Sequence, residues 1–189
     1  PFNYLNYEFK NINPYISKWK LLAKSTEFTL GPFVKKFEIE FAKYIGAKYC
    51  ISTNNGTDAL ILCLKALGVK KGDEVITVSN TFYATAGAIV ACGAKPILVD
   101  CDERYQINIR QIEKKINNKT KVIMPVHWGG ASPEMDKIVK LANKYKVKIV
   151  EDACMGIGAS IKGKSPGTFG TVNAFSMHPL KSLNVMGDG

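Results

Sequence analysis

Two adjacent carboxylates, Glu151 and Asp152, directly follow the apolar run KIV and open the turn ACMGIGAS. A carboxylate at the end of a buried strand needs a partner, because an isolated charge is costly to remove from water. A protonated pyridine nitrogen would serve Asp152 as a cationic partner. A salt bridge, or the capping of the following turn, would serve it equally well.

A reactive amine follows in AFSMHPLKS, residues 174–182, where Lys181 comes five residues after Ser176. A lysine close to a buried site can form a Schiff base with an aldehyde. Most lysines are instead solvated surface charges, and Lys181 taken alone is no exception to that expectation.

Two further segments follow predicted strands. In NNGTDAL (54–60), Gly56 and Thr57 would begin a helix, where free backbone N–H groups favour a phosphate, although such a start is also a common helix cap. In SNTFYAT (79–85), Phe82 could stack on a flat ring or belong to the core.

Taken together, these segments describe one ligand. They supply a phosphate cradle, a ring-stacking aromatic, an acid for a ring nitrogen and an amine for an aldehyde, which are the groups that pyridoxal 5′-phosphate (PLP) requires. In this interpretation Asp152 keeps the ring nitrogen protonated, so that the ring can accept electrons from a carbanion.

Alternating strands and helices must position these residues. Continuously apolar strands and short loops predict an α/β fold, a doubly wound and mostly parallel sheet that binds ligands at the carboxyl ends of its strands. For the helix over 132–146 we expect Ser132 as N-cap and Pro133 at N1. The predicted strands are 48–53, 73–79, 95–100, 121–127, 148–153 and 172–177, and the other helices are 31–46, 56–68, 81–93 and 107–116.

Composition narrows the function classes. The net charge of +10 comes from scattered lysines, which indicates a solvated surface rather than a nucleic-acid site. No apolar run approaches the ~20 residues of a membrane helix. Five cysteines without C-x-x-C spacing, beside two histidines, argue against zinc and favour reduced thiols in a cytoplasmic protein.

The segments TLGPFVKKFEIEFAKYIG, NNGTDALILCLKALG, GDEVITVSNTFYATAGAIVACGAKPILVD, VEDA and AFSMHPLKSLNVMGDG closely resemble the DegT-type sugar aminotransferases. These are PLP enzymes of fold type I, similar to aspartate aminotransferase. The resemblance implies a homodimer with shared active sites. It also implies an N-terminal segment over 1–30 and a PLP-binding large domain over 31–189, with the family's smaller C-terminal domain missing after Gly189.

The resemblance also implies residue roles. Lys181 would form the Schiff base, Asp152 would pair with the pyridinium and Phe82 would stack on the ring. The phosphate would be bound by Gly56, Thr57 and Ser176.

The sequence departs from the family pattern at Met155. Three residues after the aspartate the family usually carries Gln or His, which reaches the phenolic oxygen of the cofactor, whereas Met155 cannot donate a hydrogen bond. In HWGG (127–130), His127 and Trp128 could face the substrate or pack in the core. A related branch replaces the lysine with His and removes a hydroxyl group, and Lys181 argues against that branch.

We therefore expect an aminotransferase that converts a keto or aldehyde sugar, nucleotide-linked, to an amino sugar with glutamate or glutamine as donor. Such a step belongs to cell-surface polysaccharide or lipopolysaccharide biosynthesis. The alternatives are an 8-amino-octulosonate-type transaminase, a PLP-dependent sugar dehydratase and a non-catalytic regulatory or binding homologue.

Overall fold

The computed structural model describes residues 4–189, and the chain divides into two compact units between Ser52 and Thr53. The helix expected over 31–46 belongs to the first unit, although the sequence grouped it with the large domain. The assignment of 1–30 and 31–189 as functional parts stays a prediction.

Residues 4–52 of the first unit form three helices, α1 (Leu5–Glu8), α2 (Asn13–Ser25) and α3 (Pro32–Ile45). No helix was predicted before residue 31, and α2 forms there without a buried residue. In contrast, α3 forms where the helix over 31–46 was predicted, and Gly46, with its left-handed backbone (φ 82°), caps it.

The predicted strand 48–53 is wrong. This segment forms no ladder, and Tyr49 and Ile51 are 74% and 81% exposed. The backbone N–H of Ser52 donates to Oε1 of Glu38 at 2.7 Å, a side-chain partner in place of a neighbouring strand. Side chains suited to a strand do not make one where no adjacent strand accepts the backbone hydrogen bonds.

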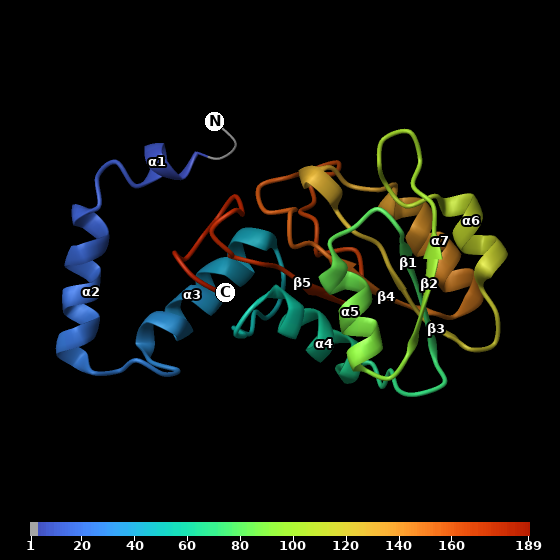
Figure 1. The fold of residues 1–189 in the computed structure, drawn as a ribbon, viewed down its shortest axis with the longest axis horizontal. Coiled ribbons are helices and arrows are strands. Elements are labelled where there is room, and N and C mark those ends of the chain that lie inside the picture. The colour runs from blue at the N-terminus through green and yellow to red at the C-terminus, as the bar shows by residue number, and fades with distance from the viewer. Residues whose placement is uncertain (1–3) are drawn as a thin grey trace. The chain divides into compact units, whose positions relative to one another are not determined.

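The second unit is built on a five-stranded parallel sheet in the order β2-β1-β3-β4-β5, which confirms the predicted fold class (Figure 1). Each remaining predicted strand forms, within a few residues of its expected bounds. The strands are β1 (Glu74–Val78), β2 (Lys95–Val99), β3 (Thr120–Met124), β4 (Lys148–Asp152) and β5 (Val172–Ala174).

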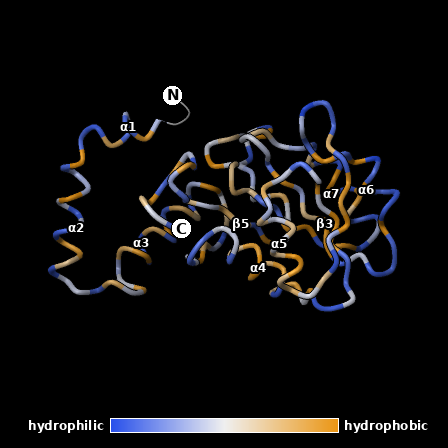
Figure 2. Tube along the Cα trace, in the orientation of Figure 1, coloured by the Kyte–Doolittle hydropathy of each residue, from blue (hydrophilic) through white to orange (hydrophobic). Residues whose placement is uncertain are grey.

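Helices cover both faces of this sheet. The buried side chains of α4 (Gly56–Ala66) and α5 (Tyr83–Ala91) form one apolar cluster with the strands. Those of α6 (Ile109–Lys115) and α7 (Met135–Tyr145) form another cluster on the opposite face. The strands between the two clusters therefore carry apolar side chains on both faces, and the trace around β3 is coloured as hydrophobic in Figure 2.

The start of α7 differs from the prediction. The helix begins at Met135, and its N-cap is Glu134, which makes no side-chain capping bond. The Ser132 hydroxyl lies instead 2.8 Å from Nδ1 of His127. The residue expected to cap the helix is therefore used to hold a buried ring.

The strand order creates a switch point beside β1. From β1 the chain crosses to β2 on one side and then returns past β1 to β3 on the other side. The loops that leave the carboxyl ends of β1 and β3 consequently diverge, which is where open α/β sheets form a ligand crevice. Residues 79–82 follow β1 there, and the end of β4 lies next to β3.

Candidate active site

The two adjacent acids at the end of β4 point to opposite faces of the sheet, because side chains alternate along a strand. Asp152 faces α5 and is 4% exposed. Its Oδ2 accepts a hydrogen bond from Oγ1 of Thr85 at 2.7 Å, and its Oδ1 accepts one from the backbone N–H of Cys154 at 3.2 Å. This carboxylate is therefore held from two directions.

Glu151 lies on the α7 face and is fully buried. His127 Nε2 lies 2.9 Å from Oε2. Burial opposes ionisation, but the hydrogen bonds from His127 and the backbone outweigh it, so the pKa of Glu151 lies below its ordinary value. The backbone N–H groups that donate to this carboxylate belong to Gly167, Phe169 and Gly170, at 2.8, 2.7 and 2.6 Å.

His127 has no exposed surface, and both of its ring nitrogens have partners, Glu151 and Ser132. Of the two alternatives for His127, packing accounts for its position in this structure. Trp128 begins the short helix η1 (Trp128–Gly130), is half-buried and packs against the α7-side cluster. Substrate contact by Trp128 stays a prediction.

The first turn of α4 lies directly against the ends of β4 and β5. A Cβ at Gly56 would lie 2.8 Å from Cβ of Ser176 and 3.0 Å from Sγ of Cys154, so only glycine fits there. Asn55 accepts the N–H of Asp58 at 2.8 Å, which caps the helix. The N–H groups of the first turn, at Gly56 and Thr57, have no acceptor within the helix itself and suit an anion.

Lys181 lies in a turn after β5, in which its N–H donates to the carbonyl of His178 at 2.8 Å. Its charge acts on the thiol of Cys154, which comes two residues after Asp152. Burial, and secondly Asp152, raise the pKa of the Cys154 thiol well above its usual value, whereas Lys181 acts in the opposite direction.

Lys181 and Met155 line the same hollow, which has a volume of about 330 Å³. Met155 therefore belongs to the lining that also contains the predicted reactive amine. The other residues of this lining are Gly129, Gly130, Ile157, Ala159, Leu180 and Ser182.

Phe82 is the N-cap of α5 and is 56% exposed, which rules out the core alternative for its ring. Its centroid lies 4.2 Å from that of Tyr83. The backbone N–H of Thr85 donates to the carbonyl of Phe82, so the exposed ring lies one helical turn from the residue that holds Asp152.

Sequence reasoning missed Thr85, Cys154 and Asn80. A signal existed for two of them: Thr85 follows Phe82 by three residues on one helix, and Cys154 follows Asp152 by two. Nδ2 of Asn80, in the loop between β1 and α5, is buried without a hydrogen-bond partner in the described part of the chain. It is therefore a donor that a ligand oxygen could satisfy.

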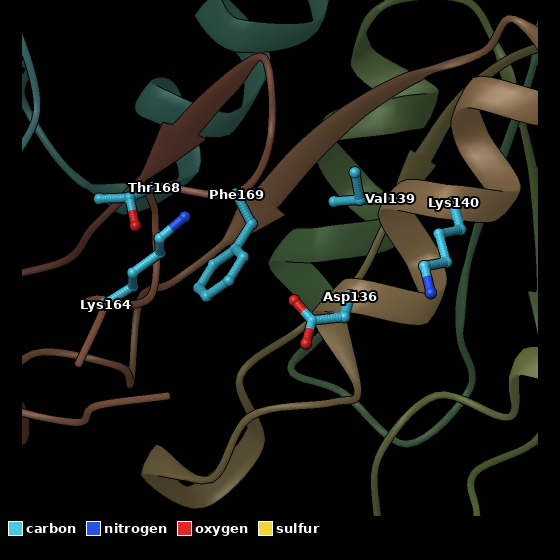
Figure 3. Close-up of a pocket in the computed structure, with 6 residues that line it drawn as sticks. All are labelled: Asp136, Val139, Lys140, Lys164, Thr168 and Phe169. Atoms are coloured by element: carbon cyan, nitrogen blue, oxygen red, sulfur yellow. The ribbon is translucent and has the colours of Figure 1, made fainter. Parts of the chain in front are cut away.

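A second hollow, of about 400 Å³, lies along α7 and contains none of the predicted site residues (Figure 3). Oδ2 of Asp136 accepts from Nζ of Lys162 at 2.6 Å, so this acid is already paired. The mixed charges give this hollow no clear preference for one ligand. Its lining comprises Asp136, Val139, Lys140, Lys164, Thr168 and Phe169.

The residues at the carboxyl edge fit PLP as a group. Helix N–H groups and the buried Ser176 hydroxyl suit its phosphate, and Asp152 suits its ring nitrogen. Lys181 offers the amine. No group of three or more His, Cys, Asp and Glu side chains that could hold a metal ion occurs among residues 4–189.

The sequence profile of the DegT/DnrJ/EryC1/StrS aminotransferase family matches residues 13–189. The chain belongs to this family. No helix in the described part of the chain is long and apolar enough to cross a membrane.

Individual members of the family are similar over most of this chain. The "pleiotropic regulatory protein" of Geobacillus stearothermophilus is 41% identical over 98% of this chain and 50% of its own length. The UDP-2-acetamido-2-deoxy-3-oxo-D-glucuronate aminotransferase of Pseudomonas aeruginosa is 44% identical over 86% of this chain and 46% of its own. The chain thus spans about half the length of these curated relatives.

Solved structures are likewise similar over most of this chain and over about half of their own length. DesV of S. venezuelae, in complex with a ketimine intermediate, superposes with a TM-score of 0.92 at 35% identity, over 100% of this chain and 51% of the other. The NtdA protein of Bacillus subtilis, with the bound cofactor PMP, superposes with a TM-score of 0.87 at 37% identity, over 99% and 42%.

Proposed function

We propose that this chain is the cofactor-binding part of a PLP-dependent sugar aminotransferase. Its substrate would be a keto or aldehyde sugar linked to a nucleotide, and glutamate or glutamine would donate the nitrogen. Family membership supports the reaction class. The observation that supports the proposal for this chain is that Asp152, the Gly56–Ser176 contact and Lys181 all lie at or beyond the carboxyl ends of the adjacent parallel strands β4 and β5.

The residues divide the work between them. When bound, PLP supplies an aldehyde that captures amines and a ring that accepts electrons. Asp152 would hold the proton on the ring nitrogen. Lys181 would bind the aldehyde carbon, give it up to the donor amine, and then move a proton as general base. Gly56, Thr57 and Ser176 would anchor the phosphate, and the exposed Phe82 ring would cover the cofactor.

Lys181 gives the direct test. Borohydride reduction of the cofactor-saturated chain should leave one pyridoxyl group, and peptide mass spectrometry should place it on Lys181. Lys181→Ala and Lys181→Arg should abolish this adduct and lower amino-group transfer by about 10²–10⁴-fold, because the base is lost.

Lys164→Ala is the matched control, since Lys164 lines the separate hollow along α7. It should keep both the adduct and the transfer activity. An adduct on another lysine, or no adduct at saturating cofactor, would remove the proposed function and favour the non-catalytic alternative. The observation that favours the non-catalytic alternative is the name of the G. stearothermophilus relative, a "pleiotropic regulatory protein".

Nucleotide-linked sugar substrates are proposed because several relatives are named for them, among them the P. aeruginosa enzyme and a GDP-perosamine synthase of Caulobacter vibrioides, 41% identical. A role in lipopolysaccharide or cell-surface polysaccharide synthesis, a homodimer with shared active sites and a cytoplasmic location are further parts of the proposal. Turnover assays with a panel of nucleotide-linked keto sugars would test the substrate class.

A further inference from the structure

A chain of two hydroxyl groups runs from the loop before α5 to the carboxylate of Asp152. Oγ1 of Thr81 lies 2.7 Å from Oγ1 of Thr85, which lies 2.7 Å from Oδ2 of Asp152. Thr85 is 1% exposed and Asp152 4%. We propose that Thr85, supported by Thr81, is a positioning residue that orients the Asp152 carboxylate toward the cofactor ring. This inference rests on the proposed function.

The chain of hydroxyl groups has a defined direction. A charged carboxylate can only accept hydrogen bonds, so the proton between Asp152 and Thr85 belongs to Thr85. A hydroxyl has a single proton, and that of Thr85 is used in this bond. The bond between the two threonines must therefore be donated by Thr81. Both protons thus point toward Asp152.

The second carboxylate oxygen is held independently. Oδ1 accepts the backbone N–H of Cys154 at 3.2 Å, and the Cys154 thiol also interacts with this carboxylate. Among the charged groups, Lys181 acts on this side of the sheet, whereas the neighbouring Glu151 bonds to His127 on the other side. The Cys154 thiol, its pKa raised by burial, stays uncharged.

In a buried site water cannot replace a lost hydrogen-bond donor. Without the Thr85 hydroxyl, Oδ2 would lose its protein donor and the carboxylate could turn. Asp152 would then hold the proton on the ring nitrogen less firmly. The effect would appear at the ring itself, before any turnover.

The test uses cofactor labelled with ¹⁵N at the ring nitrogen, whose NMR resonance distinguishes a pyridinium from a neutral pyridine. In Thr85→Val the resonance should move from the pyridinium position toward neutral pyridine, and the cofactor dissociation constant should rise about tenfold or more. Thr85→Ser, which keeps the hydroxyl, should restore the wild-type signal. Asp152→Asn defines the fully disrupted limit.

Thr77→Val is the matched control. Thr77 is also fully buried, and its hydroxyl donates to the carbonyl of Met124 at 2.8 Å, away from Asp152. It should leave the resonance unchanged. If Thr85→Val does not fold, the half-buried Thr81 carries the test, because Thr81→Val should shift the signal in the same direction by less.

The outcomes separate the two proposals. The positioning role would be overturned if folded Thr85→Val kept both the pyridinium signal and the cofactor affinity of wild type. If only Thr81→Val folds, an unshifted signal in that variant would overturn it as well. In both cases the proposed function would stand. If the signal shifted by the same amount in Thr77→Val, the cause would be a general loss of packing in the site. That result would also overturn the positioning role of Thr85. A wild-type chain without a borohydride-stable link at Lys181 would end both.

Discussion

At the scale of single residues, Met155 is the position where this chain departs from the pattern it resembles. It lines the same hollow as Lys181 and presents a thioether in place of a hydrogen-bond donor. The phenolic oxygen of a bound cofactor would then meet an apolar wall. Any donor for that oxygen must come from elsewhere.

Met155→Gln should lower the pH midpoint of the bound cofactor's absorbance change, because a donor to the phenolic oxygen favours its charged form. The shift should be about one pH unit, the size expected of one hydrogen bond to a charged group. Spectrophotometric titration measures it directly. Ile157→Gln, which places the same amide elsewhere in the lining, should leave the midpoint unchanged. Equal shifts in both variants would place Met155 away from the oxygen.

At the scale of elements, Glu151 connects β4 to the segment 167–170, which leads into β5. The Glu151 carboxylate accepts hydrogen bonds from three backbone N–H groups and from the ring of His127. Glu151, which faces away from the candidate site, therefore fixes the position of β5, the strand that precedes Ser176 and Lys181. Its contribution is to stability and position rather than to chemistry.

Glu151→Gln should reduce the free energy of unfolding by about 2–3 kcal/mol at neutral pH, since a neutral amide accepts these bonds less well. The pKa of Glu151 is lowered in the folded state, so its contribution is fully present above the unfolded value of about 4.3 and is lost as the pH falls through the lower, folded value. The stability gap between wild type and variant should therefore close in acid.

Thermal melts from pH 7 to pH 3 measure this gap. Glu113→Gln is the control, because Glu113 makes an exposed pair with Lys144 at 2.7 Å and should hardly change Tm. A gap between wild type and Glu151→Gln that stays constant down to pH 3 would contradict the assignment.

The sequence predicted the sheet well and its surroundings less well. Five of the six predicted strands form because their apolar runs lie between two layers of helices. Such apolar runs can be recognised from the sequence alone. The strand at 48–53 failed because pairing depends on a neighbour that local propensity cannot reveal. Ser132 likewise had the right chemistry for a helix cap but bonds to His127.

The site was predictable in part for the same reason. The order of the motifs predicted Asp152, Met155, Ser176 and Lys181 at one edge of the sheet. In the structure these residues lie at or after the carboxyl ends of the parallel neighbours β4 and β5, and their roles stay predictions. The spacing of Thr85 from Phe82 indicated a shared helix face, but its contact with Asp152, 67 residues away, depends on the tertiary fold. The burial of His127 depended on a partner 24 residues away.

At the scale of the whole molecule, α2 stands out because none of its residues is buried, while Trp19 and Leu21 are 55% and 53% exposed. A helix of 13 residues with no buried side chain is marginal in water. Amide hydrogen exchange in the isolated chain at low concentration should therefore be complete over 13–25 within the earliest time points, while 120–124 stays protected. Equal protection of both segments at the lowest concentration would contradict this expectation.

The opposed acids of β4 have a consequence for how this gene could change. Side chains alternate with period two, so deletion or insertion of one codon within 148–150 would exchange the faces of Glu151 and Asp152. Each carboxylate would then face the hydrogen-bond donors of the other. The fixed segment 167–170 and the candidate cofactor site would both be lost. Length variation here should survive only in even steps or outside the strand, however freely its individual apolar residues are exchanged.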